Sequence, residues 1–105
     1  MLTREGFIQA LTQVAKDTLP PQSSLLLFGS RARHDEHPGS DWDLLILLDK
    51  SKLTYTDYGI GYPFQELGWA QGEEVNPQIY SKIEWLACQA TPFYKNVEAD
   101  KIILL

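Results

Sequence analysis

Two short stretches of the chain carry the residue types that a phosphate and metal site requires. An apolar run ends in Gly29-Ser30, and after ten intervening residues Asp41 and Asp43 open a second apolar run. Gly29 has no Cβ, so the backbone there can approach a bulky ligand, and Ser30 adds a hydroxyl and an amide. Residues two apart on a strand share a face, and adjacent carboxylates repel unless a cation lies between them. These features predict a site for a nucleoside triphosphate with a divalent metal ion.

The same residues give the sequence a likeness to a known family. Gly29-Ser30, ten residues and then Asp41-x-Asp43, between two apolar runs, resembles the signature of minimal nucleotidyltransferases of the DNA polymerase β superfamily. That group includes the antitoxin partners of HEPN-domain toxins. A weaker likeness in the segment 79–97 extends the resemblance over residues 23–105. His34 stands where many relatives carry glycine, so we expect an altered turn there.

The resemblance implies a nucleotidyltransferase fold and a magnesium-dependent transfer of a nucleotidyl group to a partner protein. In the toxin–antitoxin group the group transferred is AMP from ATP, and the acceptor is a tyrosine of the toxin. By the same resemblance, Gly29 and Ser30 hold the triphosphate, while Asp41 and Asp43 bind two magnesium ions that bridge to it. Larger relatives hold the acceptor with an extra helical domain, for which this sequence has no room. We therefore expect the acceptor to be another chain, a HEPN-domain protein encoded nearby.

The third carboxylate of the family has no clear counterpart in this sequence. The segment 74–81 aligns best with Asn76 at that position, and an amide can offer a metal one oxygen but cannot act as a base near pH 7. Asn76 is therefore a candidate metal ligand. Glu74 shares its strand face and is the candidate catalytic carboxylate in its place, whereas Glu73 would need a bulge. One hypothesis is an active nucleotidyltransferase, and the alternative is a catalytically weak module of the same fold that neutralises its partner by contact.

Three more residues near these motifs are candidates for nucleotide binding. We expect residues 30–33 to begin a short helix or turn with its amides close to phosphate. Arg31 and Arg33 on this segment could contact phosphate or a partner, and a solvated loop charge is the alternative for both. Ser40, just before the aspartates, is expected to cap or orient the following strand and is included in the nucleotide site.

The helices that must support this site are marked by their caps and apolar spacing. Thr3 is expected to cap a first helix whose apolar stripe packs on a sheet and which Pro20-Pro21 ends. One kinked helix or two short ones are expected over 53–72. Ser81-x-x-Glu84 and Thr91-Pro92 are typical helix starts and predict two further helices.

The strands predict an α/β (α+β) fold, a small mixed sheet of three or four strands with helices packed on it. The segment 24–28 is a buried strand, and 44–48 is apolar on both faces, as expected of a central strand. Pro77 favours an edge position for the strand 74–81. The segment 102–105 is a short strand or a tail that docks on a partner. Residues 1–105 are expected to form one domain.

Four aromatic residues within the segment 53–72 have two possible roles, packing in the core or stacking on a base. Aromatic side chains dominate protein cores, so we favour a core position over stacking on a base. The residues are Tyr55, Tyr58, Tyr62 and Trp69.

The composition of the sequence argues against several classes of function. Hydrophobic content of 44% and charged content of 22% are ordinary for a globular domain. A net charge of −5 argues against general nucleic-acid binding and against a nuclease or phosphodiesterase. The single cysteine, Cys88, cannot form an internal disulfide, and the sequence has no apolar run of about eighteen residues and no signal-peptide pattern. We expect a cytoplasmic protein without membrane contact, with a possible homo-oligomer.

Overall fold

The first helix, α1 (Arg4–Thr18), begins where the sequence predicts. In the computed structural model, which describes residues 2–105, Thr3 is the N-cap, and its Oγ1 accepts a hydrogen bond from the Gly6 amide at 3.0 Å. The apolar stripe of α1 buries Phe7 and Leu11 against the sheet. The cap and the stripe are therefore confirmed.

Four strands form one sheet in the order β3-β2-β1-β4. Strand β1 (Ser24–Phe28) lies antiparallel to β2 (Trp42–Leu48), and β3 (Val75–Ser81) runs parallel to β2. The short strand β4 (Ile102–Ile103) pairs antiparallel with β1, so the segment 102–105 includes a strand. The mixed sheet, the central position of β2 and the edge position of β3 agree with the sequence predictions.

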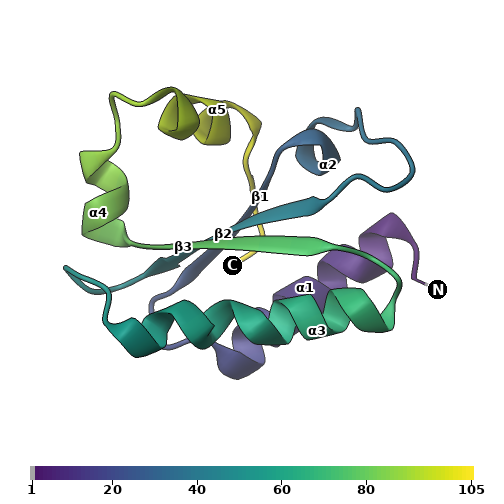
Figure 1. Ribbon diagram of the computed structural model, residues 1–105, viewed down its shortest axis with the longest axis horizontal. Coiled ribbons are helices and arrows are strands. Elements are labelled where there is room, and N and C mark those ends of the chain that lie inside the picture. Colours follow the sequence, from purple (N-terminus) through teal and green to yellow (C-terminus); the bar gives the residue numbers. More distant parts are fainter. Residues whose placement is uncertain (1) are drawn as a thin grey trace.

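The remaining helices cover both faces of the sheet (Figure 1). The 3-10 helix η1 (Tyr55–Gly61) leads into α3 (Tyr62–Ala70), which lies with α1 on one face. Helices α4 (Lys82–Ala87) and α5 (Pro92–Asp100) lie on the other. None of the helices within residues 2–105 is long and apolar enough to cross a bilayer.

The predicted caps of the last two helices are confirmed. Ser81 Oγ accepts from the Glu84 amide at 3.0 Å, and Glu84 Oε1 accepts from the Ser81 amide at 3.2 Å, which forms the capping box of α4. Thr91 caps α5, and Pro92 occupies its first turn. These contacts fix the turns that connect β3, α4 and α5.

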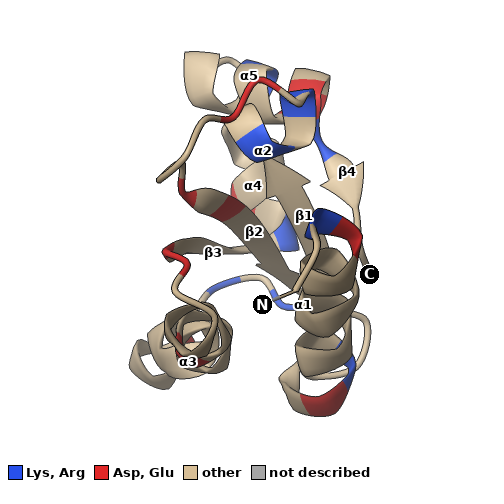
Figure 2. Ribbon diagram, turned by 90° about the vertical axis from the view of Figure 1, so that its right-hand side faces the viewer, with Lys and Arg blue, Asp and Glu red and all other residues tan. Residues whose placement is uncertain are grey.

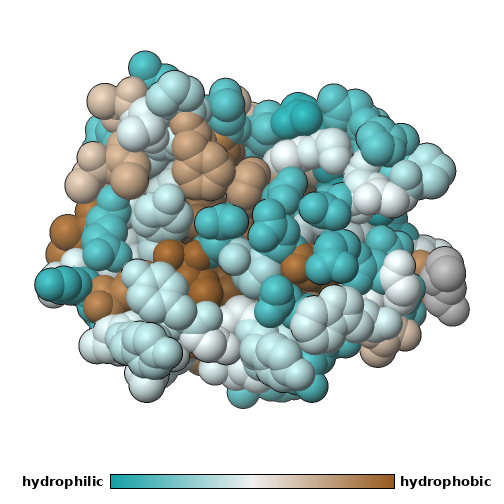
Figure 3. All heavy atoms as spheres, in the orientation of Figure 1, coloured by the Kyte–Doolittle hydropathy of each residue, from teal (hydrophilic) through white to brown (hydrophobic). Residues whose placement is uncertain are grey.

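Alternate residues of β2 supply two separate cores. Trp42, Leu44 and Ile46 pack with α1 and α3, whereas Leu45 packs with Trp85 of α4 on the opposite face. Because side chains alternate along a strand, Asp43 lies on the α4 and α5 side. Figure 3 shows hydrophobic side chains in the half of the molecule that contains α4, while the half near α2 and the following loop is mostly hydrophilic.

The prediction that the four aromatic residues of η1 and α3 are core residues is wrong. All four are exposed, from 51% for Trp69 to 94% for Tyr55, and the other two are Tyr58 and Tyr62. Glycines face the sheet in their place: a Cβ on Gly61 would lie 2.7 Å from Pro77 Cγ, and one on Gly68 would lie 2.7 Å from Val75 Cγ2. This close packing against β3 leaves no room for a large side chain at Gly61 or Gly68, and the four aromatic residues lie on the outward side.

Candidate active site

The pairing of β1 with β2 brings the Gly-Ser turn next to the aspartates. Phe28 is the partner of Asp43 in the register, so the chain leaves β1 at Gly29 beside the start of β2. Gly29 has φ 76° and ψ −161°, which residues with a Cβ rarely adopt. A Cβ at this position would also collide with Asp43 Oδ2. Both the backbone conformation and the neighbouring carboxylate therefore require glycine.

The helix α2 (Ser30–Arg33) starts directly after this turn. The Gly29 carbonyl accepts from the Ala32 and Arg33 amides at 3.0 and 3.1 Å, which fixes the turn. Within residues 2–105 the Ser30 hydroxyl has no hydrogen-bond partner, so it is available to a ligand. His34 ends α2 in the left-handed conformation, φ 62° and ψ 27°, so the turn keeps a geometry that favours glycine although histidine occupies it.

Asp43 on β2 has two polar neighbours: Asp41, two residues earlier in the chain, and Asn76 on the adjacent strand β3. Asn76 pairs with Asp43 in the register, and its Nδ2 donates to Asp43 Oδ1 at 3.4 Å. Burial raises the pKa of the Asp43 carboxyl above its ordinary value; the hydrogen bond from Asn76 opposes this shift, and the charge of Asp41 adds to it. The carboxylates of Asp41 and Asp43 are oxygen donors, and the negative charge of Asp43 is disfavoured without a nearby cation. Such a pair suits a hard divalent cation such as magnesium.

The third position beside the aspartate pair is occupied by the amide of Asn76. Glu74 lies one residue before β3, and its carbonyl accepts from the Trp42 amide at 2.9 Å. In the part of the chain that the structure describes, no three histidine, cysteine, aspartate or glutamate side chains come together as a metal site. Glu74 therefore does not form a three-carboxylate metal site with Asp41 and Asp43 among the described residues, and its catalytic role stays a prediction.

Arg31 supports the loop before β2 and does not face the aspartates. Its guanidinium lies 4.7 Å from the centre of the Trp42 ring and donates to the Ser40 carbonyl at 2.9 and 3.2 Å. It also pairs with Glu73 at 3.4 Å. Ser40 is buried, and its hydroxyl accepts from the His37 amide at 3.0 Å. The polar groups of Arg31 and Ser40 therefore hold the loop, and a nucleotide contact for either residue stays a prediction.

Arg33 lies on the aspartate side of the site. Its Nη1 donates to Asp100 of α5 at 2.6 Å, and its Nε pairs with Asp35 at 3.3 Å. Its positive charge lowers the pKa of Asp43, but burial, the largest effect, and the charge of Asp41 leave that pKa raised. Figure 2 shows this arrangement of charge, with acidic residues at the start of β2 and basic residues on α2 nearby. A phosphate contact for Arg33 stays a prediction.

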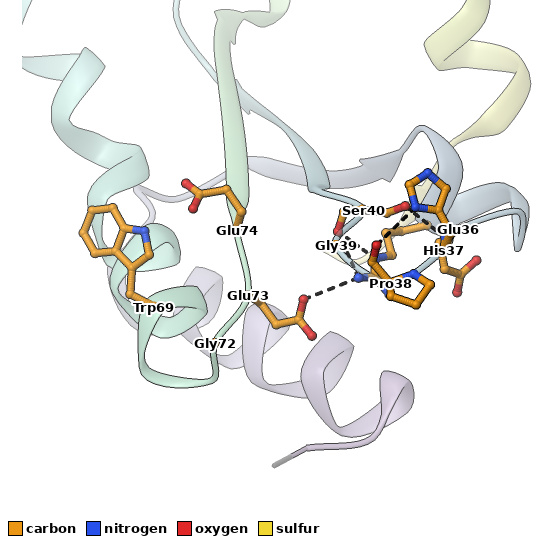
Figure 4. Close-up of a pocket in the computed structure, with 10 residues that line it drawn as sticks. Glu36, His37, Pro38, Gly39, Ser40, Trp69, Gly72, Glu73 and Glu74 are labelled. Carbon is orange, nitrogen blue, oxygen red and sulfur yellow. Dashed lines mark hydrogen bonds and ion pairs between the residues drawn. The ribbon is translucent and has the colours of Figure 1, made fainter.

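The role of Glu73 could not be predicted from the sequence. Its Oε2 accepts from Trp42 Nε1 at 3.2 Å and receives the contact from Arg31. Glu73 and Glu74 line an open hollow of about 690 Å³ between β3, the end of α3 and the loop before β2 (Figure 4). The loop side of the hollow is formed by residues 36–40, and Trp69 lies on the α3 side.

Comparison with known proteins links this geometry to one family. A family model described as "Nucleotidyltransferase domain" matches residues 8–104. None of the curated proteins compared with the chain matches it.

Three solved structures share the fold with high coverage. A toxin–antitoxin crystal structure with AMP-PNP superposes with a TM-score of 0.62 and 19% identity, and the match covers 93% of this chain and 72% of that chain. A mutant of the toxin–antitoxin MntA-HpeT gives 0.62 and 17%, with the same coverage. The tri-AMPylated Shewanella oneidensis HEPN toxin in complex with MNT antitoxin gives 0.60 and 16%, covering 98% of this chain and 72% of that chain. At these identities the similarity concerns the fold.

Proposed function

Because the chain belongs to the nucleotidyltransferase domain family, we propose that it transfers AMP from ATP to a partner protein in a magnesium-dependent reaction. The observation that carries the proposal is the contact of Gly29 with Asp43, which joins the Gly-Ser turn to the carboxylate pair. The proposed partner is a HEPN-domain protein encoded nearby. The structural similarity to a complex of an AMPylated HEPN toxin with an MNT antitoxin supports this choice.

Each residue of the site has its own role in the proposed reaction. Asp41 and Asp43 would hold Mg²⁺, which when bound neutralises phosphate charge and lowers the pKa of the attacking hydroxyl. The absence of a Cβ at Gly29 leaves the backbone open to the triphosphate, and the Ser30 hydroxyl donates to a phosphate oxygen. Arg33 adds positive charge on the same side. The acceptor hydroxyl loses its proton to solvent, and its oxygen forms a bond to the α-phosphorus as the bond to the pyrophosphate oxygen breaks and pyrophosphate leaves.

Asn76 favours a second candidate function, a partner-binding module with little or no turnover. Its amide lies beside Asp43 but cannot accept the proton of the acceptor. Loss of a general base typically costs about 10²- to 10⁴-fold in rate. A tyrosine acceptor, which the resemblance implies, would reduce this loss because the pKa of a phenol is only about 10.

Incubation with labelled ATP, magnesium and the neighbouring HEPN-domain protein tests the proposal. We expect an adenylyl mass increment on the partner and its loss with Asp41→Ala, because one of the two metal-holding carboxylates is removed. Asp49→Ala is the matched control: Asp49 is also exposed and acidic but follows the far end of β2, so transfer should persist. A tight complex without any increment would contradict the enzyme and support the binding module.

Asn76→Asp tests whether the missing carboxylate limits the rate. We expect the transfer rate to rise by about tenfold or more, since a positioned base typically contributes about 10²- to 10⁴-fold. Without magnesium the variant should unfold at a lower temperature than the wild type, because a third negative charge joins the aspartates. Gln78→Glu, two residues further along β3, is the control for added charge. Initial rates and thermal unfolding measure both effects, and an unchanged rate would rule out Asn76 as the limiting residue.

A further inference from the structure

Trp69 presents an indole to the open hollow between β3, the end of α3 and the loop before β2. The other two tryptophans, Trp42 and Trp85, are 2% and 3% exposed, whereas Trp69 is 51% exposed. The edge of the Tyr62 ring contacts it, with ring centres 6.0 Å apart and an angle of 73°, which restricts the indole without covering it. Figure 4 shows Trp69 and Glu74 on the α3 and β3 side of the hollow, with Pro38 and Ser40 across from them. The hollow therefore has one aromatic wall with an accessible face.

The charge of the hollow disfavours a polyphosphate as its occupant. Three carboxylates line it, against the single guanidinium of Arg31. Glu36 lies 3.8 Å from the Arg4 guanidinium, and Glu73 is engaged by Arg31 and the Trp42 indole. The side chain of Glu74 has no ion pair or hydrogen bond within residues 2–105 and is exposed. A neutral, flat group that donates a hydrogen bond suits this lining, with Glu74 as the acceptor.

The position of the hollow connects it to the proposed triphosphate site. Ser40 lines the hollow and is bonded directly to Asp41, and Glu74 lines it while its backbone carbonyl accepts from Trp42, the residue between the two aspartates. A ligand whose phosphates lie at the aspartates can therefore extend its other end into the hollow. For a nucleotide that end is the base.

We propose that this hollow is the nucleobase subsite, in which Trp69 stacks on the base and Glu74 accepts a hydrogen bond from its exocyclic amino group. The inference rests on the proposed function and specifies its substrate class: a nucleoside triphosphate whose base carries an amino group, as adenine does. A base with a carbonyl at that position would place an acceptor against a carboxylate and would bind less well.

Titration calorimetry with magnesium separates the base from the phosphates. For Trp69→Leu we expect the Kd of ATP to rise roughly 5- to 150-fold, the range set by base–aromatic stacking, with the Kd of inorganic tripolyphosphate unchanged. Trp69 is exposed, so the variant should fold. Tyr55→Leu, which removes an exposed aromatic outside the hollow, is the control and should change neither Kd.

The amino contact has its own measurement. The wild type should bind ATP at least about tenfold more tightly than inosine triphosphate. The 6-oxo group of inosine cannot donate the hydrogen bond that the charged Glu74 carboxylate would accept from the amino group of ATP. Glu74→Gln should reduce that preference. Equal binding of ATP and tripolyphosphate by the wild type, or an unaltered ATP affinity in Trp69→Leu, would overturn the subsite and leave the proposed function intact. Failure of the wild type to bind either ligand would overturn both.

Discussion

Replacing Gly29 with alanine is expected to lower the free energy of unfolding by about 2 to 6 kcal/mol and to abolish nucleotide binding. The observed φ of 76° and ψ of −161° cost a residue with a Cβ about 1–3 kcal/mol. The new methyl group would also collide with Asp43 Oδ2, and overpacking of this kind typically costs about 1–3 kcal/mol. Relief of the collision moves Asp43 from its position, so the site is lost together with stability. Urea denaturation and ATP titration measure the two effects.

Two other glycines separate the contributions at Gly29. Gly39 has φ 88° but nothing within 4 Å of an added Cβ, so Gly39→Ala should show the backbone cost alone. Gly59 has open space and no positive φ, so Gly59→Ala should be close to neutral. The double substitution of Gly29→Ala with Asp43→Ala should be less destabilising than the sum of the single ones, because the colliding carboxylate is gone. A Gly29→Ala variant no less stable than Gly39→Ala would show that the collision has no energetic weight.

Asp43→Asn is expected to reduce nucleotidyl transfer by about 10³-fold while it makes the metal-free chain more stable at neutral pH. A metal ion typically supplies several kcal/mol of transition-state stabilisation, and each 1.36 kcal/mol corresponds to about tenfold in rate. Burial and the charge of Asp41 raise the pKa of Asp43 in the folded state, so its ionised form disfavours folding. Asparagine keeps the shape and remains uncharged. A functional loss with a gain in stability distinguishes a ligand-holding residue from a structural one.

The pH dependence of this effect has a defined sign. A carboxyl whose pKa is raised in the folded state contributes stability below its unfolded pKa and loses that contribution as the pH rises through its folded pKa. The stability advantage of Asp43→Asn over the wild type should therefore grow from acid toward neutral pH, as followed by urea denaturation without metal. Asp49→Asn, at an exposed position, is the control. Reduced stability at neutral pH in Asp43→Asn would contradict this account.

The local sequence determines most of the fold. The caps at Thr3, Ser81 and Thr91 and the apolar run of β2 are local signals, and each predicted its element. The meeting of Gly29 and Asp43 was also predictable, because both lie at the ends of paired apolar strands. Asn76 was correctly placed beside the pair, since strand alternation and register together determine which residues share a face.

The directions in which side chains of the short helices point could not be predicted from local signals. Arg31 and Arg33 are two residues apart on the single turn of α2, and residues at that spacing point in different directions. One contacts Trp42 and the other contacts Asp100, and both partners are brought there by tertiary structure. The outward turn of Trp69 likewise depends on the close approach of α3 to β3 at Gly68. Glu74 lies one residue before β3, and its role as the third carboxylate stays a prediction.

The collision between an added Cβ at Gly29 and the carboxylate of Asp43 also constrains how the protein can evolve. While the aspartate is present, any larger residue at position 29 is selected against through folding and, under the proposed function, through catalysis. A lineage that first loses the aspartate faces only the backbone cost of replacing the glycine, and once the glycine is replaced the collision opposes the return of the aspartate. Descendants that keep only the partner-binding role should therefore lose these two residues in that order, and the loss of activity becomes difficult to reverse.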